Sequence, residues 1–291
     1  PVNDFRERER ERESSTRPSH AQHKFNFISS LRSSFIASFF INHYSHHNMS
    51  PSLPSVSSDI APIVDSPSKI QQPASKDVTT EKDYWNTFYS RFNVSIPSTW
   101  CVTTAIESDL SIPIVEFGCG NGRDAIYLAT HGFTVYGCDL SKEAIKHNNE
   151  KSANLEQLEF CLADVSIEEQ VASVMKKARS SKEGKGTQNV LVYTRFFLHS
   201  IDQRQQDLFF AALSSSCILG DKLYFEFRCS MDEALDKVHG KEHYRRYVDT
   251  PALMGDLEKG GFVVEYEVTG RGMAKYKQED PYVSRIIARK V

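Results

Sequence analysis

A glycine-rich segment at residues 115–122 constrains the fold of this 291-residue chain more than any other part of the sequence. It reads Val-Glu-Phe-Gly-Cys-Gly-Asn-Gly and joins a short apolar run, expected to be a buried strand, to a helical pattern that starts at Arg123. Glycines tolerate positive φ and let the backbone approach a ligand closely, and the start of a helix presents unpaired N–H groups. The segment therefore predicts a ligand-binding turn, although glycines between a strand and a helix can also be purely structural.

The spacing of these glycines separates two kinds of nucleotide site. A nicotinamide-binding loop has the pattern G-x-G-x-x-G, which would place its third glycine at position 123, where this chain has Arg123. The glycines stand instead at 118, 120 and 122. This pattern argues against a nicotinamide-dependent reductase.

Acidic residues follow the next two expected strands. Asp139 comes at the end of the second strand, where a carboxylate can accept both hydroxyls of a ribose, as in dinucleotide-binding folds. Asp164 follows the third strand and is expected further along the same crevice, within reach of an adenine amino group. Three consecutive strand ends thus supply a glycine turn and two carboxylates, which favours a cofactor that contains a nucleoside.

Short β-branched or aromatic runs alternate with helical patterns from Glu81 onward, which is typical of a wound α/β domain. Gly132 is suited to end the helix that starts at Arg123, and Ser141 is suited to cap the next one. About 13 residues join the last two expected strands, too few for the crossover helix of a parallel pair, so we expect an antiparallel pair. The seven expected strands are residues 112–117, 133–138, 158–162, 189–193, 222–228, 262–268 and 282–288.

The segments VEFGCGNGRD, YGCDLS and LADV, with the antiparallel last strand, resemble the class I S-adenosylmethionine-dependent methyltransferases over about residues 84–290. The resemblance implies an α/β, Rossmann-like fold with a seven-stranded mixed sheet of order 3-2-1-4-5-7-6, strand 7 antiparallel, and helices on both faces. It also implies S-adenosylmethionine as the cofactor and methyl transfer as the activity. A non-catalytic domain that keeps the cofactor pocket to regulate or scaffold a partner is the alternative.

The same resemblance assigns roles to individual residues. Glu116, Gly118 and Gly120 frame the methionine part of the cofactor, while Asp139 holds its ribose. Leu140 packs on the adenine and Asp164 meets its amino group; the remaining expected cofactor contacts are Trp85, Cys119, Arg123, Val165 and Arg195. Residues 83–89 and 96–100 look like the helix and loop that cover the cofactor in small-molecule members, or else form an ordinary aromatic cap on the core.

The acceptor side is expected after the fourth strand. Residues 193–200 would form its floor, with Arg195 and His199 as candidates for touching the acceptor, although a packed core histidine is an equally good interpretation of His199. Two polar clusters could add to the pocket, or could be solvated surface: Glu226, Arg228, Lys241, His243, Tyr244, Arg245 and Arg246, and then Arg271, Lys275, Tyr276 and Lys277.

Cationic side chains at this site would favour a small acceptor with a carboxylate or phosphate, because arginine forks suit those groups. The candidates for a catalytic role are Arg195, His199, Tyr244 and Arg245, and no general base is required unless the acceptor must lose a proton. The segments RFFLHS and EDPYVSRIIARK are faintly similar to methyltransferases associated with bacterial polysaccharide synthesis, so a glycan or phosphorylated acceptor is a further alternative.

Residues 1–80 are expected to be a disordered tail that precedes a methyltransferase domain at 81–291. Residues 6–13 alternate Arg and Glu, as a translated GA repeat would, and the first methionine is Met49, so residues 1–48 are interpreted as translated leader. The absence of Asp and Glu from 14–58 favours, alternatively, a transit peptide and an organelle instead of the cytoplasm.

Composition limits the expected partners. The formal net charge of −3 gives no signal for nucleic acid, and the sequence has no apolar run long enough for a membrane span. The six scattered cysteines form no C-x-x-C pair, so we interpret them as reduced, mostly buried residues with no metal site. The sequence does not indicate an oligomeric state.

Overall fold

The computed structural model describes residues 78–89, 94–180, 189–235 and 244–291. All described residues belong to one unit, Gln71–Val291. The expectations for the leader, the transit peptide and the disordered segment lie outside the described residues. The first described helix, α3 (Val78–Tyr89), begins just before the expected domain boundary at Glu81.

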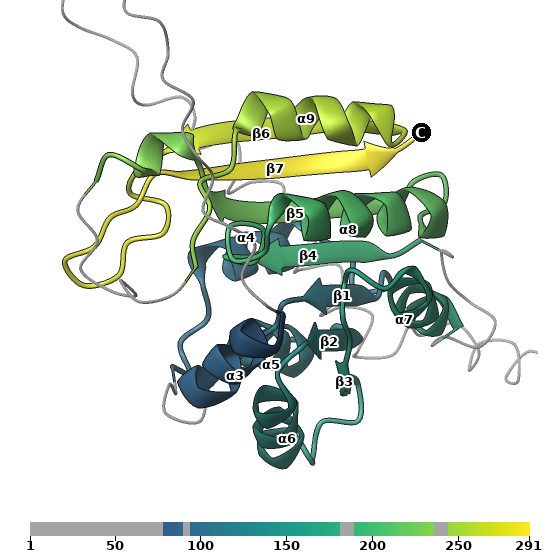
Figure 1. Cartoon of the computed structure of the whole chain (residues 1–291). Helices are drawn as coiled ribbons and strands as arrows, with labels where there is room; N and C mark the ends of the chain where they lie inside the picture. Colours follow the sequence, from purple (N-terminus) through teal and green to yellow (C-terminus); the bar gives the residue numbers. More distant parts are fainter. Residues whose placement is uncertain (1–77, 90–93, 181–188, 236–243) are drawn as a thin grey trace, which may run out of the picture. The chain divides into compact units, whose positions relative to one another are not determined.

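A seven-stranded sheet with the order β3-β2-β1-β4-β5-β7-β6 forms the centre of the described unit (Figure 1). β7 runs antiparallel to both β5 and β6, while the other neighbouring pairs are parallel. This arrangement confirms the expected order and the expected antiparallel last strand. The strands are β1 (Ile114–Phe117), β2 (Val135–Asp139), β3 (Leu158–Leu162), β4 (Leu191–Arg195), β5 (Lys222–Arg228), β6 (Phe262–Gly270) and β7 (Val283–Lys290).

Helices cover both faces of the sheet, as expected. One hydrophobic cluster joins one face to α4 (Thr99–Glu107), α5 (Arg123–Thr130) and α6 (Lys142–Lys151). A second cluster joins the opposite face to α7 (Glu168–Ser180), α8 (Gln203–Ser216) and α9 (Thr250–Lys259), of which α8 and α9 lie in front of the sheet in Figure 1. Both clusters are rich in Val, Phe, Leu and Ala that are nearly inaccessible to solvent.

Five strands, β1, β2, β4, β6 and β7, differ from the expected ranges by one or two residues at one or both ends, and the differences in β1 and β4 matter for the site. β1 begins at Ile114 because the preceding Pro113 has no N–H to donate to a neighbouring strand. β4 begins two residues later than expected and continues to Arg195, whose backbone pairs with Glu226 of β5. Arg195 therefore belongs to the sheet itself, at the carboxyl end of its strand.

Helix termini follow the expected signals. Ser141 caps α6 by accepting a hydrogen bond from the N–H of Ala144 at 3.2 Å. Gly132 has a φ of 93° directly after α5, the left-handed conformation that glycine adopts without strain. Asp249 caps α9, and Pro251 stands in its first turn. Among the helices of the described ranges, none is long and apolar enough to cross a membrane.

Candidate active site

The glycine turn after β1 is bound to the carboxyl end of β2. The N–H groups of Gly118 and Cys119 both donate to the carbonyl oxygen of Cys138, at 2.8 and 2.9 Å. Gly118 and Gly120 have φ values of 72° and 54°, which other residues rarely adopt. A methyl group at position 118 would also collide with the ring of Phe197. The glycines are therefore required both by the backbone conformation and by the close approach of neighbouring side chains.

Asp139, at the end of β2, lies beside this turn. Its Oδ2 accepts the N–H of Gly120 at 2.8 Å, and its Oδ1 accepts the N–H of Ser141 at 2.9 Å. Burial raises the pKa of this carboxyl, while the hydrogen bonds from Ser141, Gly120 and Leu140 oppose that rise. Each carboxylate oxygen can still accept a further hydrogen bond. The geometry thus suits a carboxylate that orders the turn and receives hydroxyl donors from a ligand.

Glu116, on β1 just before the turn, is a buried carboxylate that is only partly satisfied. It is 3% exposed, and its Oε2 has no hydrogen-bond partner among the described residues. Burial raises its pKa well above the ordinary value, and the nearby Asp124 adds to the effect, while Arg123 opposes it. A buried acceptor without a partner is costly in a native protein and is often explained by a missing ligand or water. Glu116 therefore fits the ammonium group of an amino-acid ligand.

Helix α3 lies against the glycine turn and α6. Ser141 donates its hydroxyl hydrogen to Asn86 Oδ1 at 2.8 Å, and a methyl group at position 120 would meet Tyr89 Oη at 2.5 Å. The rings of Trp85 and Tyr89 stack with their centroids 5.7 Å apart. Burial, and then Asp139, raises the pKa of Tyr89 well above its usual range. Helix α3 thus lies over the turn, and Tyr89, which belongs to the expected covering segment 83–89 but was not singled out there, faces the turn four residues after Trp85.

The expected adenine side lies along β3, the strand next to β2. Asp164 Oδ1 accepts both the N–H and the hydroxyl of Ser166, at 2.9 and 2.5 Å. This contact fixes the carboxyl and leaves Oδ2 for a further donor. Val165 is buried and Leu140 is half-buried. The residues expected around an adenine ring therefore follow the ends of two paired strands.

Ser98 and Asp124 anchor the beginning of α4. Asp124, which is 2% exposed, accepts the N–H and the hydroxyl of Ser98 at 2.8 and 2.7 Å and the hydroxyl of Tyr193 at 2.9 Å. Ser98 Oγ also accepts the N–H of Cys101 and so caps the helix. Arg123 Nε lies 3.7 Å from Asp124 Oδ1. The sequence analysis missed Asp124, and it named Ser98 and Tyr193 only as members of the expected covering loop and acceptor floor, because their contacts join distant segments without a local motif.

Arg195 is held by a buried carboxylate. Its Nε donates to Glu226 Oε1 at 2.9 Å, and Glu226, which is fully buried, also accepts the Nε–H of Arg285 at 2.8 Å on its other oxygen. Arg285 donates from Nη2 to Thr99 Oγ1 at 2.7 Å, which ties this group to α4. Burial alone would lower the pKa of the Arg195 guanidinium, but Glu226 reverses this effect and raises that pKa. Arg195 therefore stays cationic, and within the described ranges its two terminal amino groups have no hydrogen-bond partner.

A second guanidinium lies close to Arg195. Burial and the charge of Arg195 both lower the pKa of Arg123. Both arginines lie near Asp124. Arg123 contacts Asp124 directly. Asp124 also binds Tyr193, which shares a face of β4 with Arg195. Two positively charged guanidinium groups thus lie at one edge of the sheet, where a bound anion would reduce their repulsion.

His199 has a packing role. The ring is 4% exposed, and its Nδ1 accepts the N–H of Arg228 at 3.1 Å. An accepting Nδ1 implies that the proton of the neutral ring is on Nε2. The ring also packs edge-on against Phe196, at a centroid distance of 5.2 Å. These contacts favour the interpretation of His199 as a core histidine.

Most residues of the two polar clusters have structural partners or are exposed. Arg228 bonds to Asp232 at 2.8 Å and to Glu279, and Arg246 bonds to the carbonyl of Leu198 at 3.1 Å and to two glutamines. Burial lowers the pKa of Arg245, and the neighbouring Arg228 lowers it further. Tyr244 is half-buried, whereas the second cluster is exposed: Arg271, Lys275, Tyr276 and Lys277. Lys241 and His243 lie outside the described residues.

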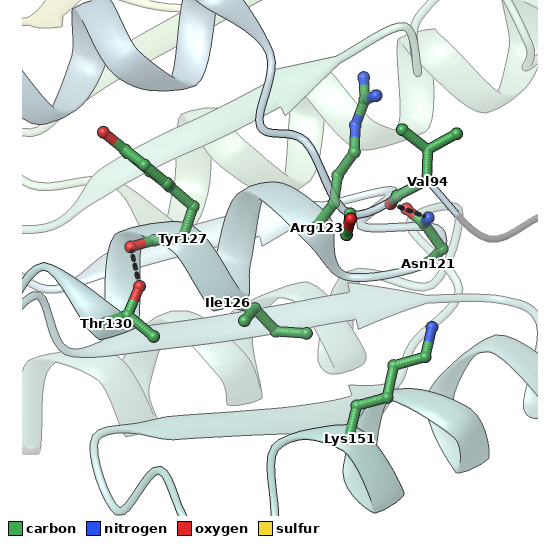
Figure 2. A pocket seen from close by; sticks show the side chains of 8 residues that line it. Val94, Asn121, Arg123, Ile126, Tyr127, Thr130 and Lys151 are labelled. Carbon is green, nitrogen blue, oxygen red and sulfur yellow. Dashed lines mark hydrogen bonds between the residues drawn. The ribbon is translucent and has the colours of Figure 1, made fainter.

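A pocket of about 210 Å³ lies beside α5 (Figure 2). Its wall includes Asn121, whose side chain donates to the carbonyl of Val94 at 2.6 Å. The guanidinium of Arg123 points away from Ile126 and Lys151 in Figure 2. The eight lining residues are Val94, Ser95, Asn121, Arg123, Ile126, Tyr127, Thr130 and Lys151, and they include neither Glu116 nor Asp139. The lining of this pocket therefore does not include the two acids expected to bind the cofactor. No group of three or more His, Cys, Asp and Glu side chains in the described ranges could hold a metal ion.

Comparison with known proteins agrees with this geometry. Residues 114–211 match the model of a methyltransferase domain. An S-adenosylmethionine-dependent methyltransferase from Anabaena variabilis has a similar structure (TM-score 0.58, 19% identity, covering 78% of this chain and 100% of that one). So does the CcbJ methyltransferase from Streptomyces caelestis (TM-score 0.54, 16% identity, 74% and 100%). No curated protein sequence matches the chain. Residues 114–211 thus resemble a methyltransferase domain, and the described unit shares the Rossmann-like fold of S-adenosylmethionine-dependent methyltransferases.

Proposed function

We propose that this protein transfers a methyl group from S-adenosylmethionine to a small acceptor that carries a carboxylate or a phosphate. The position and contacts of Arg195 are the observation that supports an anionic acceptor. Its guanidinium is fixed by the buried Glu226 at the carboxyl end of β4, and none of the described residues forms a hydrogen bond with its terminal amino groups. Ligands of open α/β sheets bind at that edge.

The residues around the glycine turn fit the cofactor. The unpaired Oε2 of Glu116 suits the ammonium of the methionine part, and the turn at Gly118 and Gly120 allows close approach of its backbone. Asp139 and Asp164 would hold the ribose and the adenine amino group. When bound, S-adenosylmethionine supplies an already activated methyl group on its sulfonium.

The protein itself would contribute position and exclusion of water. Alignment of two bound reactants can provide roughly 7–11 kcal/mol of the barrier reduction. Trp85 and Tyr89 would cover the cofactor, and the bond between Thr99 and Arg285 keeps α4 over the acceptor side. A carboxylate or sulfide acceptor atom needs no general base, and the contacts of His199 do not favour one.

The charge balance around Glu226 supports an anionic acceptor. One buried carboxylate is shared by Arg195 and Arg285, and a third guanidinium, that of Arg123, lies nearby with Asp124 at 3.7 Å, so three cations face two carboxylates. Buried ion pairs of this kind add little net stability. A bound carboxylate or phosphate would balance the excess positive charge, and an arginine fork binds either group through two parallel hydrogen bonds.

The acceptor can be found with a radiolabelled methyl donor. Purified protein is incubated with labelled S-adenosylmethionine and metabolite extract, and the labelled product is identified. We expect an anionic acceptor whose KM rises strongly in Arg195→Lys, because lysine keeps the charge but loses the planar fork, whereas the KM for the cofactor changes little. The matched control is Arg271→Lys, at an exposed position.

Three outcomes would contradict the proposed function or its acceptor class. Binding of the cofactor without transfer to any component of the extract would favour a non-catalytic domain. A neutral or cationic acceptor would refute the role of Arg195. Arg195→Lys could also weaken the binding of S-adenosylhomocysteine but not that of 5′-methylthioadenosine, which lacks the amino-acid part. Arg195 would then bind the carboxylate of the cofactor instead.

A further inference from the structure

Two cysteine thiols face each other directly behind the glycine turn. Cys138 of β2 and Cys161 of β3 are partners in the parallel register, and their sulfur atoms lie 2.9 Å apart. Neither cysteine has a role in the proposed methyl transfer. The structure therefore brings together a pair of nucleophilic groups that the interpretation of the cysteines as inert did not anticipate.

The backbone geometry is compatible with a disulfide between these residues. Neighbouring strands lie about 4.7–4.9 Å apart, and the Cα atoms of disulfide-bonded cysteines are usually about 4.4–6.8 Å apart. Bond formation would bring the sulfur atoms from 2.9 Å to about 2.04 Å. The required movement is small, but it would draw the paired ends of β2 and β3 together.

The two thiols differ in access and acidity. Cys138 is 1% exposed, whereas Cys161 is half-buried and can be reached from solvent. The hydrogen bond from the Cys138 thiol lowers the pKa of Cys161, and the same bond, together with burial, raises the pKa of Cys138. The thiolate is the reactive form of cysteine. Cys161 is therefore suited to react first with an oxidant, and Cys138 to react second.

We propose that Cys138 and Cys161 form a reversible disulfide that changes the glycine turn. With a small disulfide such as oxidised glutathione, the Cys161 thiolate attacks one sulfur and releases one glutathione thiolate. The sulfur of Cys138 then loses its proton and attacks Cys161 Sγ, which releases the second glutathione as a thiol. The protein loses two protons and two electrons, and the glutathione disulfide is reduced to two glutathione molecules.

Movement at Cys138 would be passed to the turn through short contacts. The carbonyl oxygen of Cys138 accepts both the Gly118 and the Cys119 N–H groups, and the next residue, Asp139, accepts the N–H of Gly120. A shift of β2 toward β3 therefore changes three hydrogen bonds that order the turn. The effect on the cofactor rests on the proposed function, whereas the disulfide and the change in the turn do not.

The test compares the full chain after treatment with oxidised glutathione and after treatment with dithiothreitol. Peptide mass spectrometry should find a Cys138–Cys161 crosslink with the loss of two hydrogens. Hydrogen exchange at Gly118, Cys119 and Gly120 should accelerate, and the affinity for S-adenosylhomocysteine should fall about tenfold and return on reduction. Cys161→Ser should abolish all three effects, whereas Cys217→Ser, at a buried cysteine near Asp221, should retain them.

Other outcomes would overturn the inference. A stable glutathione adduct on Cys161, or a crosslink of either residue to Cys119, would show that the pair does not close. A Cys138–Cys161 crosslink with unchanged hydrogen exchange at the glycine turn would show that the disulfide does not change the turn. If the reduced protein fails to bind S-adenosylhomocysteine, the proposed function fails, and the crosslink and the exchange rates still decide the role of the pair.

Discussion

Glu116 is expected to strengthen ligand binding and to lower the stability of the ligand-free protein near neutral pH. Burial raises its pKa well above the value of about 4.5 that it would have in the unfolded chain. Between these two values the folded protein holds a proton that the unfolded chain has released, so stability is greatest below the unfolded value. The stability of the ligand-free protein therefore falls as the pH rises through this window, and a bound ammonium would offset the loss.

Replacement of Glu116 by Gln should separate the two effects. Because glutamine does not ionise, the melting temperature of the ligand-free variant relative to the wild type should increase between pH 5 and pH 8. The affinity for S-adenosylhomocysteine should fall by about 1.5–3 kcal/mol, the range for a hydrogen bond to a charged group. Thermal scans and calorimetric titration measure both quantities. Glu150→Gln, on the exposed side of α6, is the control, and a relative melting temperature that is independent of pH would contradict the assignment.

Asp139 supports both the turn and, by the proposed function, the ribose. Asp139→Ala should weaken the binding of S-adenosylhomocysteine by about 1.5–3 kcal/mol. The wild type should also prefer adenosine to 2′,3′-dideoxyadenosine, and the variant should lose that preference because the hydroxyl acceptor is gone. Titration calorimetry of the folded variant measures both. Unchanged affinity would remove Asp139 from the ribose site.

Local motifs predict some site residues and miss others for a physical reason. The turn at Gly118 and Gly120 and the acid at Asp139 follow strand ends, so their placement can be derived from the chain order alone. Glu226 was placed only in a polar cluster that could line the pocket or be solvated surface, and its buried bond to Arg195 depends on the pairing of β4 with β5. Contacts of this kind leave no spacing pattern in the sequence.

At the scale of elements, α4 depends on a single serine. Ser98 accepts the N–H of Cys101 and donates to the buried Asp124. Ser98→Ala should therefore lower the free energy of unfolding by about 1–2 kcal/mol, the upper range for loss of an N-cap. Urea denaturation measures the change. Thr103→Ala removes a hydroxyl from the same helix and should cost clearly less, and equal losses would mean that the cap and the Asp124 contact contribute little.

Sequence patterns located the strands better than their ends. All seven expected strands exist because apolar, β-branched runs between turn residues are buried in the sheet. The end of β4 could not be predicted because Arg195 is charged, and its place in the sheet depends on Glu226 and Arg285. The packing of α3 on the turn was expected only from the family resemblance, and the contact of Tyr89 with Gly120 supplies its physical basis.

At the scale of the whole molecule, the length of the connection between the last two strands predicted how these strands run relative to each other. Its shortness excludes a crossover helix and requires the antiparallel β7 that the sheet contains. The strand order itself came from the resemblance, because residue patterns do not fix which parallel strands are neighbours.

Two truncations test where the functional unit begins. The buried hydrophobic residues of the described ranges all lie between Trp100 and Ala288, so removal of residues 1–48 should change neither the melting temperature nor the affinity for S-adenosylhomocysteine. Removal of residues 1–89 also deletes α3, and with it the Asn86 bond to Ser141 and the contact of Tyr89 with Gly120. The shorter protein should keep the circular dichroism spectrum of the α/β sheet and bind the ligand at least about tenfold more weakly. A large loss of stability in the first truncation would refute the leader interpretation, and undiminished binding in the second would show that α3 does not cover the cofactor.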